Sequence, residues 1–150
     1  MNLFAQRLRE FRVETGLSQR KFGEYLGIKT TSYPNYEKGL AHPCIADLRK
    51  IAVQLDISLD YLLGRINEKK SLSSRFDKEE VVPFKERVRQ LRLEKQMTQV
   101  DMVEGMGLLS RFSCIHYERG TREPNAERLI ALADLFGVSL DYLVGFEEKS

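Results

Sequence analysis

The sequence contains few of the side chains that hold metals or form disulfides: two cysteines and two histidines among 150 residues. One disulfide between Cys44 and Cys114 is conceivable, but we interpret both as unpaired, buried thiols of a cytoplasmic protein. His42, Cys44, Cys114 and His116 also lack the close ligand spacing of a zinc site. We therefore predict neither a metal nor any other cofactor.

Motifs of catalysis are missing as well. The histidines and cysteines form no nucleophile–base pattern, and the sequence has no glycine-rich loop of the kind that cradles phosphates. We therefore predict that the protein is not an enzyme.

Long hydrophobic runs are absent too. No apolar segment approaches the ~20 residues that span a membrane, and the first residues, Met1-Asn2-Leu3, lead into a charged segment rather than a signal peptide. We expect a cytoplasmic protein without a membrane partner.

No large excess of one charge is present, since the net charge is only +2. Residues 1–66 carry ten basic and seven acidic side chains, whereas residues 84–150 carry ten and eleven. Nothing resembles a polybasic nucleic-acid tail. If the protein binds DNA, its positive charge must be concentrated on one face.

The sequence does contain an internal repeat. Phe4–Gly27 matches Phe84–Gly107 at a spacing of 80 residues, and Tyr36–Gly64 matches Tyr117–Gly145 at a spacing of 81. The closest match is Ser58-Leu59-Asp60-Tyr61-Leu62-Leu63-Gly64 with Ser139-Leu140-Asp141-Tyr142-Leu143-Val144-Gly145. This period exceeds the roughly 20–50 residues of solenoid repeats, so the chain holds two copies of a small domain.

Apolar residues recur at three- and four-residue steps, which predicts five short helices in each copy. In the first copy they end near Gly16, Gly27, Gly39, Leu55 and Gly64, with Ser18 as one N-cap. In the second copy we expect helices at 84–96, 98–106, 110–119, 125–136 and 139–144, with Thr98 as a cap. No stretch alternates with period two for long enough to predict a strand. The expected organisation is all-α: domains at 1–66 and 84–150, and a polar linker at 67–83 that is helical in part after Arg75.

Three motifs in each copy resemble the Cro/phage-repressor (XRE-like) class of helix-turn-helix domains. In the first copy they are Ser18-Gln19 with Leu26-Gly27, Tyr36-Glu37-Lys38-Gly39, and Ser58-Leu59-Asp60-Tyr61-Leu62. In the second they are Thr98-Gln99 with Met106-Gly107, Tyr117-Glu118-Arg119-Gly120, and Ser139 to Leu143. The two resemblances together cover about four-fifths of the chain. They imply two tandem five-helix repressor-like domains, each with a helix that enters the major groove.

The resemblance also implies roles for individual residues. A glutamine at the start of the second helix contacts a phosphate in this class, and Gln19 and Gln99 match that position. The class pairs an arginine of the first helix with the glutamate at the end of the third. Those positions hold two expected structural ion pairs, Arg12 with Glu37 and Arg92 with Glu118.

The copies differ most in their expected recognition helices. The residues of the first copy expected to face DNA are Gln19, Arg20, Lys29, Thr30, Thr31, Asn35 and Lys38. Those of the second copy are Gln99, Arg111, Phe112, His116, Arg119 and Arg122. By position, Thr30, Thr31 and Asn35 face bases in the first copy, as do Arg111, Phe112 and His116 in the second. Lys38, Arg119 and Arg122 fall near the sugar–phosphate backbone.

Pro34 departs from the pattern of the class. In a helix interior a proline removes a hydrogen bond and clashes with the preceding turn, at about 3 kcal/mol or more. We therefore predict that this helix starts late, with Thr31 or Ser32 as its cap. Part of the reading surface is then turn rather than helix.

These expectations favour a sequence-specific, double-stranded DNA-binding transcriptional regulator, a repressor of prokaryotic or phage type. The alternative is a protein-interaction regulator, an antitoxin or antirepressor, whose second domain binds a partner protein. An apolar or acidic surface around Arg111 would favour that alternative. We expect a homodimer on DNA; the alternative is a monomer whose two domains act as a pseudo-dimer.

Overall fold

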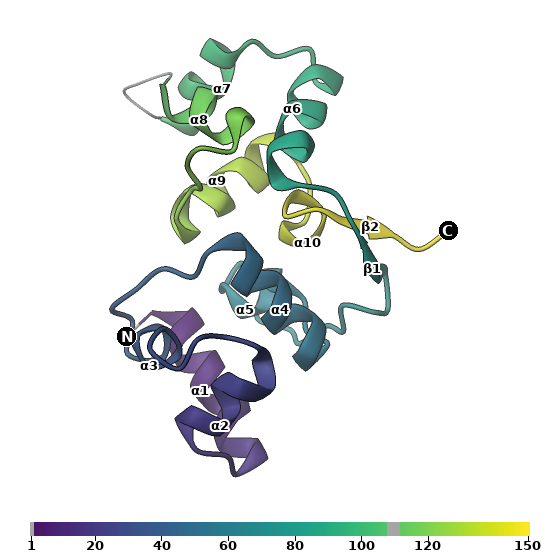
Figure 1. Ribbon diagram of the computed structural model, residues 1–150. Coiled ribbons are helices and arrows are strands. Elements are labelled where there is room, and N and C mark those ends of the chain that lie inside the picture. Colours follow the sequence, from purple (N-terminus) through teal and green to yellow (C-terminus); the bar gives the residue numbers. More distant parts are fainter. Residues whose placement is uncertain (1, 108–111) are drawn as a thin grey trace. The chain divides into compact units, whose positions relative to one another are not determined.

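The computed structural model describes residues 2–107 and 112–150. It divides the chain into two compact units, Met1–Ser74 and Arg75–Ser150, called here the first and second unit. Both are mostly helical (Figure 1). The prediction of two tandem helical domains is confirmed.

The described residues of the first unit form five helices joined by short turns (Figure 1). Their bounds are α1 (Leu3–Thr15), α2 (Gln19–Leu26), α3 (Tyr33–Glu37), α4 (Ile45–Leu55) and α5 (Leu59–Leu62). Asn2, Ser18 and Ser58 accept hydrogen bonds from N–H groups in the first turns of α1, α2 and α5. These caps satisfy donors that a helix cannot satisfy itself, and the cap predicted at Ser18 is confirmed.

The second unit repeats this plan and adds two strands. Its described elements are β1 (Phe76–Val81), α6 (Phe84–Glu94), α7 (Gln99–Met106), α8 (Phe112–Arg119), α9 (Ala126–Phe136), α10 (Leu140–Leu143) and β2 (Phe146–Glu148). Thr98 caps α7, as predicted, and the Asp101 side chain accepts a hydrogen bond from the Thr98 N–H in return. The first two residues of the helix expected at 110–119 lie outside the described residues.

Matched residues of the two copies form the two cores. Tyr36 and Tyr117 are buried, as are Leu48 and Leu129, which confirms the core positions expected from the repeat. The cysteines behave differently from our interpretation: Cys114 is buried, but Cys44 is exposed at the start of α4. There its sulfur accepts a hydrogen bond from the Asp47 N–H, so it acts as a helix cap.

A buried arginine ties the first helix of each unit to its last helix. Arg7 lies 4.0 Å from the centre of the Tyr61 ring and donates to the backbone oxygens of Tyr61 and Ile66. The matched Arg87 lies 3.7 Å from the Tyr142 ring and pairs with the Glu147 carboxylate. A guanidinium stacked on an aromatic face is electrostatically favourable, so these arginines close each helical unit.

The prediction that the chain has no strand is wrong. β1 pairs antiparallel with β2, with Phe76 opposite Glu148 and Asp77 opposite Glu147 (Figure 1). The strands bury Phe76 and Phe146, whereas β1 continues with four charged residues, 77–80, and ends at the exposed Val81. A short strand with one buried side chain has too little alternation to be recognised in the sequence.

The linker expected at 67–83 is also incorrect. Its first part packs on the first unit: Leu72 is fully buried, the Ser58 N–H donates to Lys70 O at 2.8 Å, and the Ser73 N–H donates to Asp56 at 2.9 Å. Its second part forms β1 of the second unit rather than a helix. The boundary between the units in the sequence falls between Ser74 and Arg75, so residues 67–74 belong to the first unit and residues 75–83 to the second.

These contacts predict that the 67–74 segment stabilises the first unit. Leu72→Ala should lower the free energy of unfolding by about 2–5 kcal/mol, because it leaves a cavity in a packed site. Lys70→Ala is the matched control, since this exposed residue contributes its backbone oxygen to the segment. Urea denaturation of the full chain measures both variants. Equal, small effects would show that the segment is only loosely attached.

Candidate nucleic-acid interface

In the first unit, α2 and α3 are joined by a turn that begins at Gly27. Gly27 has φ of 78°, a left-handed conformation that is open to glycine at little cost. Its N–H donates to Glu24 O at 3.0 Å, and the next N–H, of Ile28, donates to Gly23 O at 2.9 Å. These bonds end α2 and turn the chain sharply toward α3.

The predicted late start of α3 is confirmed. Ser32 precedes the helix, and Pro34 is its second residue, where a backbone N–H has no partner within the helix. Lys29 O accepts hydrogen bonds from the Ser32 and Tyr33 N–H groups at 3.0 and 3.1 Å. Thr30 and Thr31 therefore lie on a hydrogen-bonded turn, and the expected reading surface is part turn and part helix.

Arg12 holds this helix-turn-helix together. Its Nε lies 3.1 and 2.9 Å from the two carboxylate oxygens of Glu37, and its Nη2 lies 2.7 Å from Oε1. Its Nη1 also donates to Leu17 O at 3.1 Å. One side chain thus joins α1, the turn before α2 and the end of α3.

The second unit contains the same arrangement. Arg92 Nε lies 3.1 Å from both oxygens of Glu118, and Nη1 donates to Met97 O at 2.9 Å. Gln99 adds a bond, from Nε2 to Glu118 Oε2 at 3.1 Å. The first residue of α7 is thereby fixed to the end of α8.

The environment of Glu37 keeps it ionised. Its burial would raise the pKa, but the hydrogen bonds and the positive charge of Arg12 outweigh burial and hold the pKa of Glu37 below its ordinary value of 4.5. The carboxylate is only 3% exposed, and the Arg12 side chain 18%. This pair is therefore a mostly buried interaction and not a surface salt bridge.

The contact between the two helices of each motif is made differently in the two units. In the first unit a methyl group added at Gly23 would lie 3.1 Å from Tyr33 Cβ, which is closer than most real contacts. The matched residues of the second unit are Val103 and Cys114, both buried. The first unit thus combines a small residue on α2, Gly23, with a large one on α3, Tyr33. The second unit has two residues of intermediate size at these positions.

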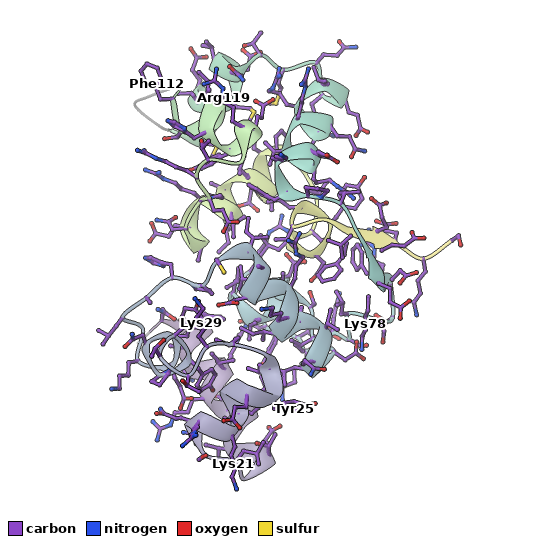
Figure 2. The ribbon with its side chains drawn as sticks, viewed as in Figure 1. Lys21, Tyr25, Lys29, Lys78, Phe112 and Arg119 are labelled. Carbon is purple, nitrogen blue, oxygen red and sulfur yellow. The ribbon has the colours of Figure 1, made fainter. Side chains whose placement is uncertain are left out.

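Most DNA-facing residues expected in the first unit lie at its surface. The exposed ones are Arg20, Lys29, Thr30, Thr31, Asn35 and Lys38, and Gln19 is half-buried. Arg20 forms an exposed pair with Glu24 at 3.4 Å. Lys21 is not among the residues expected to face DNA, but it is also exposed and projects away from the ribbon (Figure 2). Its place next to Arg20 in the sequence could have identified it as part of the basic surface.

The residues expected in the second unit are less uniform. Arg111 lies outside the described residues. Arg119 and Arg122 are exposed, and His116 Nδ1 lies 2.7 Å from the Thr121 hydroxyl oxygen. Phe112 is 63% exposed and projects from the start of α8 (Figure 2).

A groove in the second unit was not expected from the sequence. Its lining is mixed: Met97, Val100, Phe112 and Ile115 are apolar, and Arg92, Thr98 and Gln99 are polar. We call it the α7–α8 groove. Val100 occupies the position of Arg20 and is 45% exposed. Comparison of these two aligned positions would have revealed the change from cation to apolar side chain.

Within 2–107 and 112–150, no three histidine, cysteine or acidic side chains are grouped so that they could hold a metal ion. Among those same residues, no helix is both long enough and apolar enough to cross a membrane.

Comparisons with known proteins place these features in context. The Helix-turn-helix family matches the chain twice, at residues 8–62 and 88–143. The SPbeta prophage-derived uncharacterized HTH-type transcriptional regulator YonR of Bacillus subtilis is 34% identical over 80 residues, which cover 53% of this chain and 68% of YonR. The cryptic phage CTXphi transcriptional repressor RstR of Vibrio cholerae is 40% identical over 60 residues, 40% of this chain and 54% of RstR. The chain thus spans about half to two-thirds of these relatives. No solved structure matches it.

The buried ion pair predicts a pH-dependent stability. Glu37→Gln should lower the free energy of unfolding at pH 7 by about 3–5 kcal/mol, because it leaves a mostly buried guanidinium without its counter-ion. The pKa of Glu37 is lower in the folded state than in the unfolded state. The ionised carboxylate therefore stabilises the fold fully above its ordinary pKa, and this stabilisation is lost as the pH falls through the pKa of the folded state. The difference between protein and variant should therefore shrink below about pH 4.

Glu24→Gln is the matched control, because Glu24 is 57% exposed in a surface pair. It should change the stability by less than about 1 kcal/mol. Urea denaturation at about four pH values between about pH 3 and pH 7 measures the free energy of unfolding of both variants. A Glu37→Gln effect that is the same at every pH would contradict the assignment.

The exchanged packing predicts a coupling between two positions. Gly23→Val alone should destabilise the first unit by about 1–3 kcal/mol, because the new side chain overlaps Tyr33. Tyr33→Cys alone should leave a cavity. The double variant should be more stable than the sum of the two separate losses predicts. Tyr33→Cys makes room for the new valine, and the valine fills the cavity that the missing tyrosine leaves. A double-mutant cycle of unfolding free energies measures the coupling, and strict additivity would refute it.

Proposed function

Because the chain belongs to the helix-turn-helix family, we propose that it is a sequence-specific, double-stranded DNA-binding transcriptional regulator of prokaryotic or phage type. The observation that carries the proposal is the row of exposed polar and basic side chains along α2, the turn and α3 of the first unit. Arg12 and Glu37 hold these elements in place beneath it.

Phosphate contacts position the protein on the duplex. We assign these phosphate contacts to three exposed cations, Arg20, Lys29 and Lys38. Gln19, at the first position of α2, is a fourth contact. The N-terminus of a helix also favours an anion, because its free N–H groups carry partial positive charge. Lys21 adds a further cation to this surface.

Base contacts supply the sequence preference. The amide of Asn35 can donate to and accept from adenine in the major groove, and the methyl groups of Thr30 and Thr31 can contact thymine. Asn35 Nδ2 lies 3.4 Å from Thr31 O. This bond is long and weak, so the amide is available to a base.

The proposed mode of action is repression by occupancy. A protein bound at an operator blocks access to it, and this requires only a DNA-binding surface. The relative RstR is named a transcriptional repressor. We accordingly propose a cytoplasmic protein that acts without catalysis or a cofactor.

The contribution of the second unit has two candidate explanations. Gln99, Arg111, Phe112, His116, Arg119 and Arg122 stay predicted DNA contacts, of which Arg119 and Arg122 are exposed cations. The alternative, an interaction with protein as in an antitoxin or antirepressor, is supported by the α7–α8 groove. Val100 and Phe112 expose apolar surface there, at the positions of Arg20 and Thr31.

Substitutions in the first unit separate base reading from phosphate binding. Asn35→Ala should lose about 1–3 kcal/mol of binding to the preferred site and relax one base position. Arg20→Ala should instead weaken binding to all sequences alike and reduce the salt dependence by about one phosphate contact. Fluorescence anisotropy with a site selected from random DNA, at several salt concentrations, measures both effects.

Lys70→Ala is the control for charge, because Lys70 is an exposed cation outside α2 and α3. It should leave binding nearly unchanged. Equal, sequence-independent losses from Asn35→Ala and Arg20→Ala would remove Asn35 from the base-reading surface. Failure of the unmodified protein to select any sequence would contradict the proposed function itself.

A further inference from the structure

The α7–α8 groove combines exposed apolar side chains in a place where the first unit is polar. Phe112 is 63% exposed and Val100 45% exposed, and both line the groove with Met97 and Ile115. In the first unit the positions of Val100 and Phe112 are held by Arg20 and Thr31. The same groove also contains the polar Arg92, Thr98 and Gln99. An apolar centre with a polar rim is the usual composition of a protein–protein interface.

Charges of opposite sign border the two ends of the groove. Gln99 bonds to Glu118, so the start of α7 lies beside the end of α8. A neighbouring hollow at this end shares Arg92, Gln99 and Ile115 with the groove. It is also lined by Arg89, Arg119 and Glu118, so three arginines and one carboxylate leave this end basic. At the other end, Glu104 lies one helical turn beyond Val100 and on the same side of α7.

We propose that this face binds the same face of a second copy of the chain in a two-fold arrangement. A two-fold axis through the apolar centre brings the basic end of one copy opposite the acidic end of the other. Phe112 and Val100 are then buried between the copies, and Glu104 of each copy faces Arg119 of its partner. The face is thus complementary to itself in both apolarity and charge.

The same features oppose DNA binding at this face. In the first unit Glu24 is paired with Arg20, whereas in the second Glu104 has Val100 at the corresponding position. A carboxylate beside a phosphate is repelled, and an exposed valine offers the phosphate no hydrogen bond. A partner that carries both apolar and basic side chains fits better, and a second copy supplies both.

This pairing gives the two units different roles. The second unit joins two chains, and the first unit of each chain keeps its polar α2–α3 surface for DNA. Two identical readers then favour a site with two-fold symmetry. Dimerisation without DNA does not depend on the proposed function, so the two inferences can fail separately.

Sedimentation equilibrium of the full chain without DNA tests the apolar part. The unmodified protein should form a dimer. Phe112→Ser and Val100→Arg should each raise the dimer dissociation constant about tenfold or more, since buried aromatic and central residues dominate such interfaces. Leu93→Ser is the matched control, because Leu93 is 54% exposed on α6 and does not line the groove. Circular dichroism checks that each variant is folded.

A charge exchange tests the two-fold geometry. Glu104→Arg should weaken the dimer, as should Arg119→Glu, because each change places like charges opposite one another. The double variant should recover most of the lost affinity, since opposite charges then face each other again. Recovery is not expected from a merely structural effect of either substitution.

Three outcomes would overturn the inference. The first is a protein that stays monomeric at every concentration tested, and the second is a dimer that is insensitive to Phe112→Ser and Val100→Arg. The third is a Phe112→Ser variant whose self-association is unchanged but whose affinity for the selected DNA falls. That result would assign the groove to DNA instead.

Discussion

The mostly buried arginine–glutamate pair is the interaction on which each helix-turn-helix depends. Arg12 reaches from α1 to Glu37 at the end of α3 and also binds Leu17 O before α2, so one guanidinium fixes three segments. Neither partner can be removed without leaving a poorly solvated charge, which is far more costly than loss of a surface pair. Because α3 has only five residues, it has little helical stability of its own. Its place comes from this pair and from its packing on α2.

The internal repeat made much of the fold predictable from the sequence. Several residues that match between the copies are buried, such as Leu48 and Leu129, or cap helices, such as Ser18 and Thr98. The late start of α3 followed from the geometry of proline alone, because a residue without an N–H fits the first turn of a helix. In the candidate site, Arg12 and Glu37 lie together where the resemblance placed them. The DNA contacts themselves stay a prediction.

What could not be predicted depends on tertiary contacts with weak local signals. Most residues of β1 are charged, so the sequence does not indicate a strand there. Its partner β2 lies about seventy positions away, so their pairing has no local signal. Leu72 is a single apolar residue in a polar stretch, so its burial cannot be inferred from periodicity. The exchange of Gly23 and Tyr33 for Val103 and Cys114 is visible in the sequence, but its meaning requires knowing that the two positions touch.

The buried residues maintain the fold that defines the family, whereas recognition of a ligand depends on the exposed residues. The arginine–glutamate pair is common to both units, as Arg12 with Glu37 and Arg92 with Glu118. Packing of α2 on α3 in the first unit corresponds to packing of α7 on α8 in the second, although the residues differ in size. Their surfaces are under no such constraint, since an exposed Arg20 or Val100 contributes little to stability. The same scaffold can therefore present a polar, basic surface in one unit and a groove with exposed apolar side chains in the other. Function must accordingly be assigned to each unit from its own exposed side chains.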